Sequence, residues 1–117
     1  MIGDKSSIKK STLHSSTKHT SSLSEILDVI GALNTYAYAY VKDYIYFLIP
    51  KIMQIVEKSK KSKSELAAKA ISLLITIQSK ILDDYLYLII PEMINICSKN
   101  NSKLMEMATA LIIKVIR

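Results

Sequence analysis

One segment of the sequence occurs twice, 41 positions apart, and this repetition limits what the chain can fold into. Residues 43–55 read DYIYFLIPKIMQI, and residues 84–96 read DYLYLIIPEMINI, without a gap between the copies. The identical positions include both tyrosines and the proline of each copy: Asp43/Asp84, Tyr44/Tyr85, Tyr46/Tyr87, Ile49/Ile90, Pro50/Pro91 and Ile55/Ile96. A self-match at a fixed distance is typical of a chain built from stacked copies of one structural unit.

The alanine-rich segments that flank these copies repeat with the same spacing. The aligned positions are 66–71 (LAAKAI) with 107–112 (MATALI), Leu74 with Val115, Ile30 with Ile71, and Leu33 with Leu74. If the proline-containing segments are named A and the alanine-rich ones B, the order is B, A, B, A, B. A period near 41 residues is typical of HEAT or armadillo helical pairs. The sequence therefore predicts an all-α solenoid of about two and a half HEAT-type helical hairpins.

Apolar residues recur at three- and four-residue intervals over most of residues 22–117, which predicts helices that each bury one face. The expected helices are 22–35, 42–58, 64–81, 83–98 and 102–117. Ser22 and Glu25 have the spacing of a capping box, which sets the start of the first helix. Its expected apolar face consists of Leu23, Ile26, Leu27, Ile30 and Leu33.

Two features of the sequence, the prolines and an alternating segment, bear on the shape of the expected helices. Pro50 has no N–H and crowds the carbonyl of Tyr46, so we expect a kink near it, and the recurrence at Pro91 favours a shared kinked helix. Residues 36–40 alternate tyrosine with alanine, as a strand could. We interpret them as a continuing helix that enters a short turn, because the chain offers no second strand for pairing.

The first 21 residues differ in composition from the rest. They are rich in serine, threonine and lysine, and they carry few large apolar side chains. Such a segment buries too little surface to offset its conformational entropy, so residues 1–21 are expected to form a disordered or loosely held tail before a helical domain at 22–117. His14 and His19 lie in this tail without the cysteine or carboxylate neighbours of a zinc site.

The net charge of +6 is concentrated in two stretches: Lys5, Lys9, Lys10 and Lys18 in the tail, and Lys58, Lys60, Lys61 and Lys63 between two expected helices. A basic balance can indicate nucleic-acid binding. These lysines have no interleaved aromatic residues, so we interpret them as a solvated tail and loop.

Further patterns limit the compartment and the chemistry. The longest apolar run is interrupted by Pro50, Lys51 and Gln54 and is shorter than the roughly 18 residues of a membrane-spanning helix. The amino-terminal residues do not form a signal peptide. Cys97 is the single cysteine, so no disulfide can form within the chain, and a buried structural thiol is expected. These absences favour the cytoplasm or the nucleus.

The sequence predicts no catalytic, cofactor-binding or metal site, and hence no enzyme. Gly3 and Gly31 are the only glycines, which excludes glycine-rich phosphate loops. None of the expected helices contains a histidine that could act as a general base. Asp83 and Asp84 are interpreted as charges at a helix N-terminus, since adjacent side chains on a helix point apart. The tyrosines of the A segments (Tyr44, Tyr46, Tyr85 and Tyr87) are expected to pack with their hydroxyls at the rim.

Several motifs together resemble the HEAT repeats in the N-terminal solenoid of target-of-rapamycin (TOR) kinases. They are residues 43–50, Ala67-Ala68, Asp84-Tyr85 and 89–91, and the similarity spans about Leu23 to Arg117. The chain departs from that pattern at Ile90, where the family has histidine before the proline, and at 58–63, where lysines replace prolines. The resemblance implies partner binding and dimer assembly within a serine/threonine kinase whose ATP site lies outside this chain.

The expected function is a non-catalytic helical-repeat scaffold that binds protein partners or neighbouring HEAT repeats. The first B helix has no A partner, and Arg117 ends an apolar helix without a cap, so we expect a fragment of a longer protein or a chain whose ends another chain covers. One alternative is an importin-like or tubulin-binding adaptor, which would be marked by an acidic or tryptophan-bearing inner surface. Another is a basic nucleic-acid-binding helical protein, whose affinity would fall steeply with salt.

Overall fold

The computed structural model describes residues 15–99 and 102–117, and this part of the chain is helical without any strand. The elements in order are α2 (Ser15–Tyr36), α3 (Tyr38–Ser59), α4 (Ser64–Thr76), α5 (Ser79–Leu82), a 3-10 turn η1 (Asp83–Tyr85), α6 (Leu86–Cys97) and α7 (Ser102–Ile116). The prediction of an all-α chain is confirmed over these residues.

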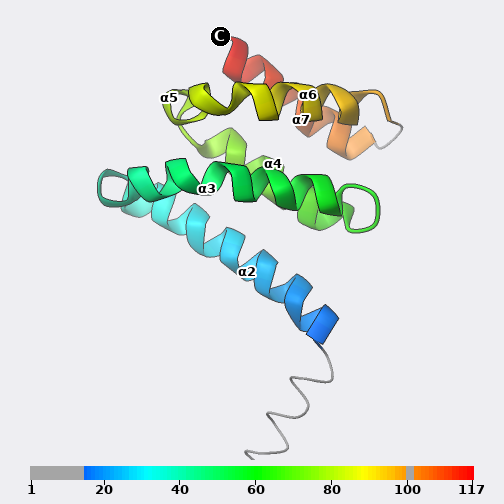
Figure 1. Cartoon of the computed structure of the whole chain (residues 1–117), viewed down its shortest axis with the longest axis horizontal. Helices are drawn as coiled ribbons and strands as arrows, with labels where there is room; N and C mark the ends of the chain where they lie inside the picture. Colours follow the sequence, from blue (N-terminus) through cyan, green and yellow to red (C-terminus); the bar gives the residue numbers. More distant parts are fainter. Residues whose placement is uncertain (1–14, 100–101) are drawn as a thin grey trace, which may run out of the picture.

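The two proline-containing helices form one layer and the alanine-rich helices form a second. α3 and α6 lie side by side, while α4 and α7 pack behind them, and α2 runs obliquely along the free side of α3 and α4 (Figure 1). The segments of the 41-residue self-match thus occupy matching places, with α3 and α4 in contact and α6 and α7 in contact.

The core lies between these layers because each helix has an apolar face at helical spacing. α3 contributes Ile45, Ile49, Ile52 and Val56, which are at most 2% exposed. α4 supplies small residues where the helices approach, and Ala67, Ala70, Ile71 and Leu74 are all fully buried. Alanine adds little bulk at such positions, so several helices can pack against α4 at once.

Polar contacts attach α2 to α4 outside this core. The Lys69 ammonium donates to Ser24 Oγ at 2.6 Å and pairs with Asp28 Oδ1 at 2.9 Å. Near the other end of α2, Asn34 Nδ2 donates to the Thr76 carbonyl at 3.3 Å. These contacts set the place of α2 along the long axis of α4.

Several helix boundaries differ from the sequence prediction. α2 begins at Ser15, so Ser22 lies inside the helix and is not its cap, and residues 15–21 are helical although they were expected in the tail. Residues 1–14 of that tail lie outside the described residues. α3 begins at Tyr38, before the expected residue 42, and only Ala37 separates it from α2. The alternating segment 36–40 is therefore mostly helical, as we interpreted it.

The predicted helix 64–81 is broken in the structure. α4 ends at Thr76, Ile77 and Gln78 adopt extended conformations with ψ of 141° and 137°, and α5 follows. Ile77 remains fully buried in its extended conformation, so it keeps the apolar pattern unbroken across the break. For this reason, hydrophobic periodicity alone does not reveal the end of α4. The expected helix 83–98 likewise begins with the 3-10 turn η1.

Both prolines lie inside α-helices that continue past them. Proline removes one intrahelical hydrogen bond, that to the carbonyl four residues earlier, but the buried faces of α3 and α6 hold the remaining turns. Pro50 and Pro91 therefore do not end the helices.

The close packing around α4 leads to a stability prediction. Ala70→Leu should lower the free energy of unfolding by about 1–3 kcal/mol, because the added side chain has no free volume to occupy. Urea denaturation measures the effect. Ala110→Leu is the matched control: Ala110 is exposed on α7, so the change there should stay within about 0.5 kcal/mol. Equal effects at the two positions would contradict the assigned core.

Candidate interaction surface

All eight aromatic residues of the chain fall within two short segments, 36–47 and 85–87. The structure brings these segments together where η1 meets α3. The ring centroids of Tyr46 and Tyr85 are 5.0 Å apart, and those of Tyr46 and Phe47 are 5.2 Å apart in an edge-on arrangement. The two segments are distant in the sequence. The packing of α6 and η1 beside α3 brings Tyr85 next to Tyr46.

Four of these aromatics are strongly exposed, and we name them the aromatic stripe: Tyr36 at the end of α2, and Tyr40, Tyr44 and Phe47 on α3. Tyr40, Tyr44 and Phe47 follow one another at intervals of four and three residues on α3, so they share one face. The four side chains are 71–88% exposed. The prediction that the A-segment tyrosines are packed is wrong for Tyr44 and Tyr87, which are 72% and 70% exposed.

A second exposed row lies on α2 and consists of Ile26, Val29 and Leu33, at 49%, 57% and 41% exposure. The sequence predicted Ile26 and Leu33 on the buried face together with Leu27 and Ile30. Only Leu27 and Ile30 are buried, because α3 and α4 cover just one side of α2. Tyr36 follows Leu33 by three residues on α2, so it lies next to this second row.

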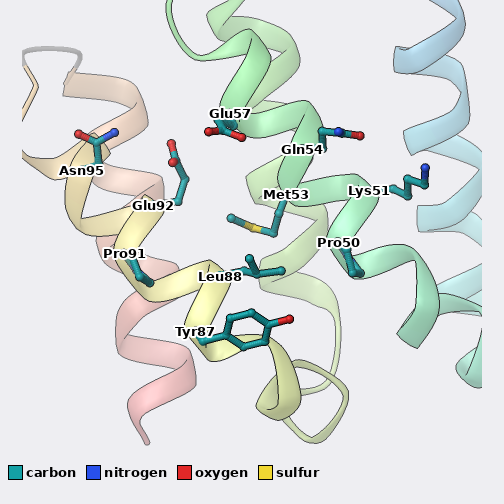
Figure 2. A pocket seen from close by; sticks show the side chains of 10 residues that line it. All are labelled: Pro50, Lys51, Met53, Gln54, Glu57, Tyr87, Leu88, Pro91, Glu92 and Asn95. Atoms are coloured by element: carbon teal, nitrogen blue, oxygen red, sulfur yellow. The ribbon is translucent and has the colours of Figure 1, made fainter.

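A groove of about 620 Å³ lies between α3 and α6 on the outer side of their layer (Figure 2). Its lining combines the two prolines and apolar side chains with polar groups: Pro50, Lys51, Met53, Gln54, Glu57, Tyr87, Leu88, Pro91, Glu92 and Asn95. Equivalent positions of the self-match line both sides of the groove: Pro50 and Gln54 on α3, and Pro91 and Asn95 on α6.

A hydrogen bond joins α3 to η1 near one end of this contact. The Tyr46 hydroxyl donates to Asp84 Oδ2 at 2.7 Å. This bond is the main reason why the pKa of Tyr46 is raised from about 10 to about 12, with desolvation as a smaller contribution. Asp83 and Asp84 lie in the first turn of η1, as interpreted from the sequence, but the hydrogen bond from Tyr46 on α3 to Asp84 was not expected. Sequence reasoning missed this pair because its residues lie 38 positions apart.

An ion pair joins the other end of the contact. Lys60 Nζ lies 2.6 Å from Glu92 Oε2, and both side chains are only 14% exposed. Part of the lysine-rich loop is therefore neutralised by α6. Lys61 and Lys63 of the same loop remain exposed.

The described residues contain few side chains of the kinds that act in catalysis or metal binding. No set of three His, Cys, Asp or Glu side chains there could hold a metal ion. Cys97, expected to be buried, is half-buried, with its Sγ 3.5 Å from Thr109 Oγ1 on α7. His14 lies outside the described residues, as does the side chain of His19. None of the described helices is long and apolar enough to cross a membrane.

The Tyr46–Asp84 bond leads to a pH prediction. Because the pKa of Tyr46 is raised on folding, its contribution to stability is complete below pH 10 and is lost as the pH rises towards about 12. The difference in phenolate absorbance between the wild type and Tyr46→Phe should therefore reach its midpoint near pH 12. A midpoint near 10 would show that the bond does not persist in solution.

The Lys60–Glu92 pair leads to a stability prediction. Lys60→Met should lower the free energy of unfolding by about 1–3 kcal/mol, because Glu92 then stays largely buried without a partner. Urea denaturation provides the measurement. Lys61→Met, at an exposed position one residue along the loop, should change it by less than about 0.5 kcal/mol. If both variants lose the same stability, the ion pair has no role in joining α3 to α6.

Comparison with protein-family models, with curated proteins and with solved structures finds no significant match to this chain.

Proposed function

We propose that this chain is a non-catalytic scaffold of HEAT-type helical hairpins that binds other proteins. The observation that carries the proposal is the aromatic stripe: Tyr36, Tyr40, Tyr44 and Phe47 are 71–88% exposed on a small helical domain. The 41-residue self-match supports a HEAT-type arrangement, with α3–α4 and α6–α7 as two hairpins and α2 as the second helix of a preceding one.

The size of the stripe favours a role in binding. A buried aromatic side chain covers about 150–250 Å². Four side chains that are 71–88% exposed therefore present on the order of 600 Å². The largest apolar patch of an ordinary monomer is about 300–600 Å², and a standard interface buries about 800 Å² on each partner. With Ile26, Val29 and Leu33 on α2, the exposed apolar surface reaches the interface range.

The chemistry of the stripe also favours protein recognition. Tyrosine is enriched at interface hot spots because it buries a large apolar ring while its hydroxyl keeps a polar partner or water. Tyrosine has only two side-chain torsions, so it loses less rotamer freedom on binding than long flexible side chains do. The resemblance to TOR kinases supports a scaffold role of the same kind, in which this chain contributes binding surface and the kinase site lies elsewhere.

The experiment compares three tagged forms of the chain: the wild type, Tyr44→Ser/Phe47→Ser, and the control Gln54→Ser/Lys58→Ser at the polar end of the same α3 face. A partner recovered with the wild type is purified, and its affinity is measured by calorimetry. We expect the aromatic variant to bind at least about tenfold more weakly and the control to bind like the wild type.

Circular dichroism and urea denaturation establish that the variants remain folded. A partner that binds all three forms equally would rule out the aromatic stripe as the site. Failure to recover any direct partner that distinguishes the forms would count against the scaffold function itself.

A further inference from the structure

The packing of α6 on α3 indicates which kind of helix fits the exposed side of α3. α6 and η1 pack on α3 through Asp84, Tyr85, Leu88 and Glu92. These side chains meet a face of α3 made of Tyr46, Pro50 and Met53, and the Lys60 ammonium just beyond the helix. Acceptor, apolar and charged groups therefore follow one another along this contact.

The four docking residues of η1 and α6 have counterparts on α3, 41 positions earlier: Asp43 for Asp84, Tyr44 for Tyr85, Phe47 for Leu88 and Lys51 for Glu92. All four counterparts are exposed, whereas Tyr85, Leu88 and Glu92 are half-buried against α3. The exposed side of α3 thus carries the same kind of docking surface, with no helix of the described chain packed on it.

α2 supplies the second wall of this site. Its exposed Ile26, Val29 and Leu33 correspond, 41 positions on, to Ala67, Ala70 and Leu74 of α4, all fully buried in the core. Among the described helices, α3 packs against α4 on one side and α6 on another. α2 and α3 therefore form a site like the one that α3 itself fills, and no helix of the described residues occupies it. We define the α2–α3 seat as Ile26, Val29 and Leu33 with Tyr44, Phe47 and Lys51.

We propose that the α2–α3 seat binds one amphipathic α-helix of a partner protein, and that this helix resembles α3 with one charge reversed. It carries a tyrosine whose hydroxyl donates to Asp43, as Tyr46 donates to Asp84. Apolar residues follow four and seven positions later, as Pro50 and Met53 follow Tyr46. This inference rests on the proposed scaffold function and names its partner class.

Charge complementarity specifies the last feature of the partner. Lys60 pairs with Glu92 in the observed contact, but the seat has Lys51 in the place of Glu92. The partner helix must therefore have an acidic residue in the place of Lys60. A second copy of this chain does not fit, because its α3 face is covered by α6, and the residue after its α6 that corresponds to Lys60 is the uncharged Asn101.

The probe is a labelled peptide spanning residues 38–62 of this chain, made with Lys60 or with Lys60→Glu. Its Tyr44 and Phe47, which would face solvent in the seat, are replaced by glutamine for solubility. Fluorescence anisotropy with the full chain measures the affinity of each form. We expect the acidic peptide to bind the wild-type chain about fivefold more tightly than the lysine peptide, and Lys51→Glu to reverse this preference.

Two variants of the chain control this measurement. Lys61→Glu changes the net charge equally but lies outside the seat, so the preference for the acidic peptide should remain. Tyr44→Ser/Phe47→Ser should weaken binding of both peptides by at least about tenfold. A peptide that invades the fold and replaces α3 would bind this variant undiminished, which would overturn the proposal.

Three other outcomes would also overturn it: no saturable binding, a preference that Lys51→Glu leaves unchanged, or a preference that Lys61→Glu reverses equally. Sedimentation of the chain alone tests the remaining occupant, a second copy. Self-association of the wild type that Tyr44→Ser/Phe47→Ser abolishes would show that a second copy fills the seat, which would overturn the proposal. If neither peptide binds, the proposal for the seat fails. The scaffold proposal still stands if a natural partner binds the Tyr44→Ser/Phe47→Ser variant more weakly than the wild type.

Discussion

The structure depends on the burial of α4, the helix that α2, α3 and α7 all contact. Burial of an apolar helix on several sides requires small side chains where the neighbouring backbones approach and large ones where space remains. α4 meets this requirement, because Ala67 and Ala70 alternate with Ile71 and Leu74 and all four are fully buried. Since α4 is surrounded, its neighbours have fixed places, and their outer faces become the surface of the molecule.

The contact between α3 and α6 is of a different kind. It is shallow and leaves an open groove, so apolar burial contributes less to it than to the core around α4. A Tyr46–Asp84 hydrogen bond and a Lys60–Glu92 ion pair join its two ends. Polar pairs with defined geometry fix the register of helices that apolar contact alone would allow to slide. The same combination of aromatic and polar groups gives the proposed α2–α3 seat its selectivity.

Helix existence could be predicted from the sequence, but several ends and contacts could not. Periodic apolar residues correctly indicated helices at the five expected places. The break after Thr76 was not visible, because Ile77 stays buried in an extended conformation and keeps the pattern intact. Asp84 lies at a helix start, as the sequence indicated, but its partner Tyr46 comes from another helix, so local spacing could not reveal this hydrogen bond.

The sequence by itself determined the all-α class and the alignment of Pro50 with Pro91, since helical periodicity and self-similarity are properties of local order. Only the tertiary structure decided which apolar residues are buried. Ile26 and Leu27 are adjacent and both apolar, yet one is 49% exposed and the other 2%, because α3 and α4 cover a single side of α2. Met53 and Ile94 occupy equivalent positions but are 6% and 56% exposed, because α6 lies beside α3 and no described helix occupies that place beside α6. Burial of a residue depends on which helix packs against it, and that is decided by contacts between segments that are distant in the sequence.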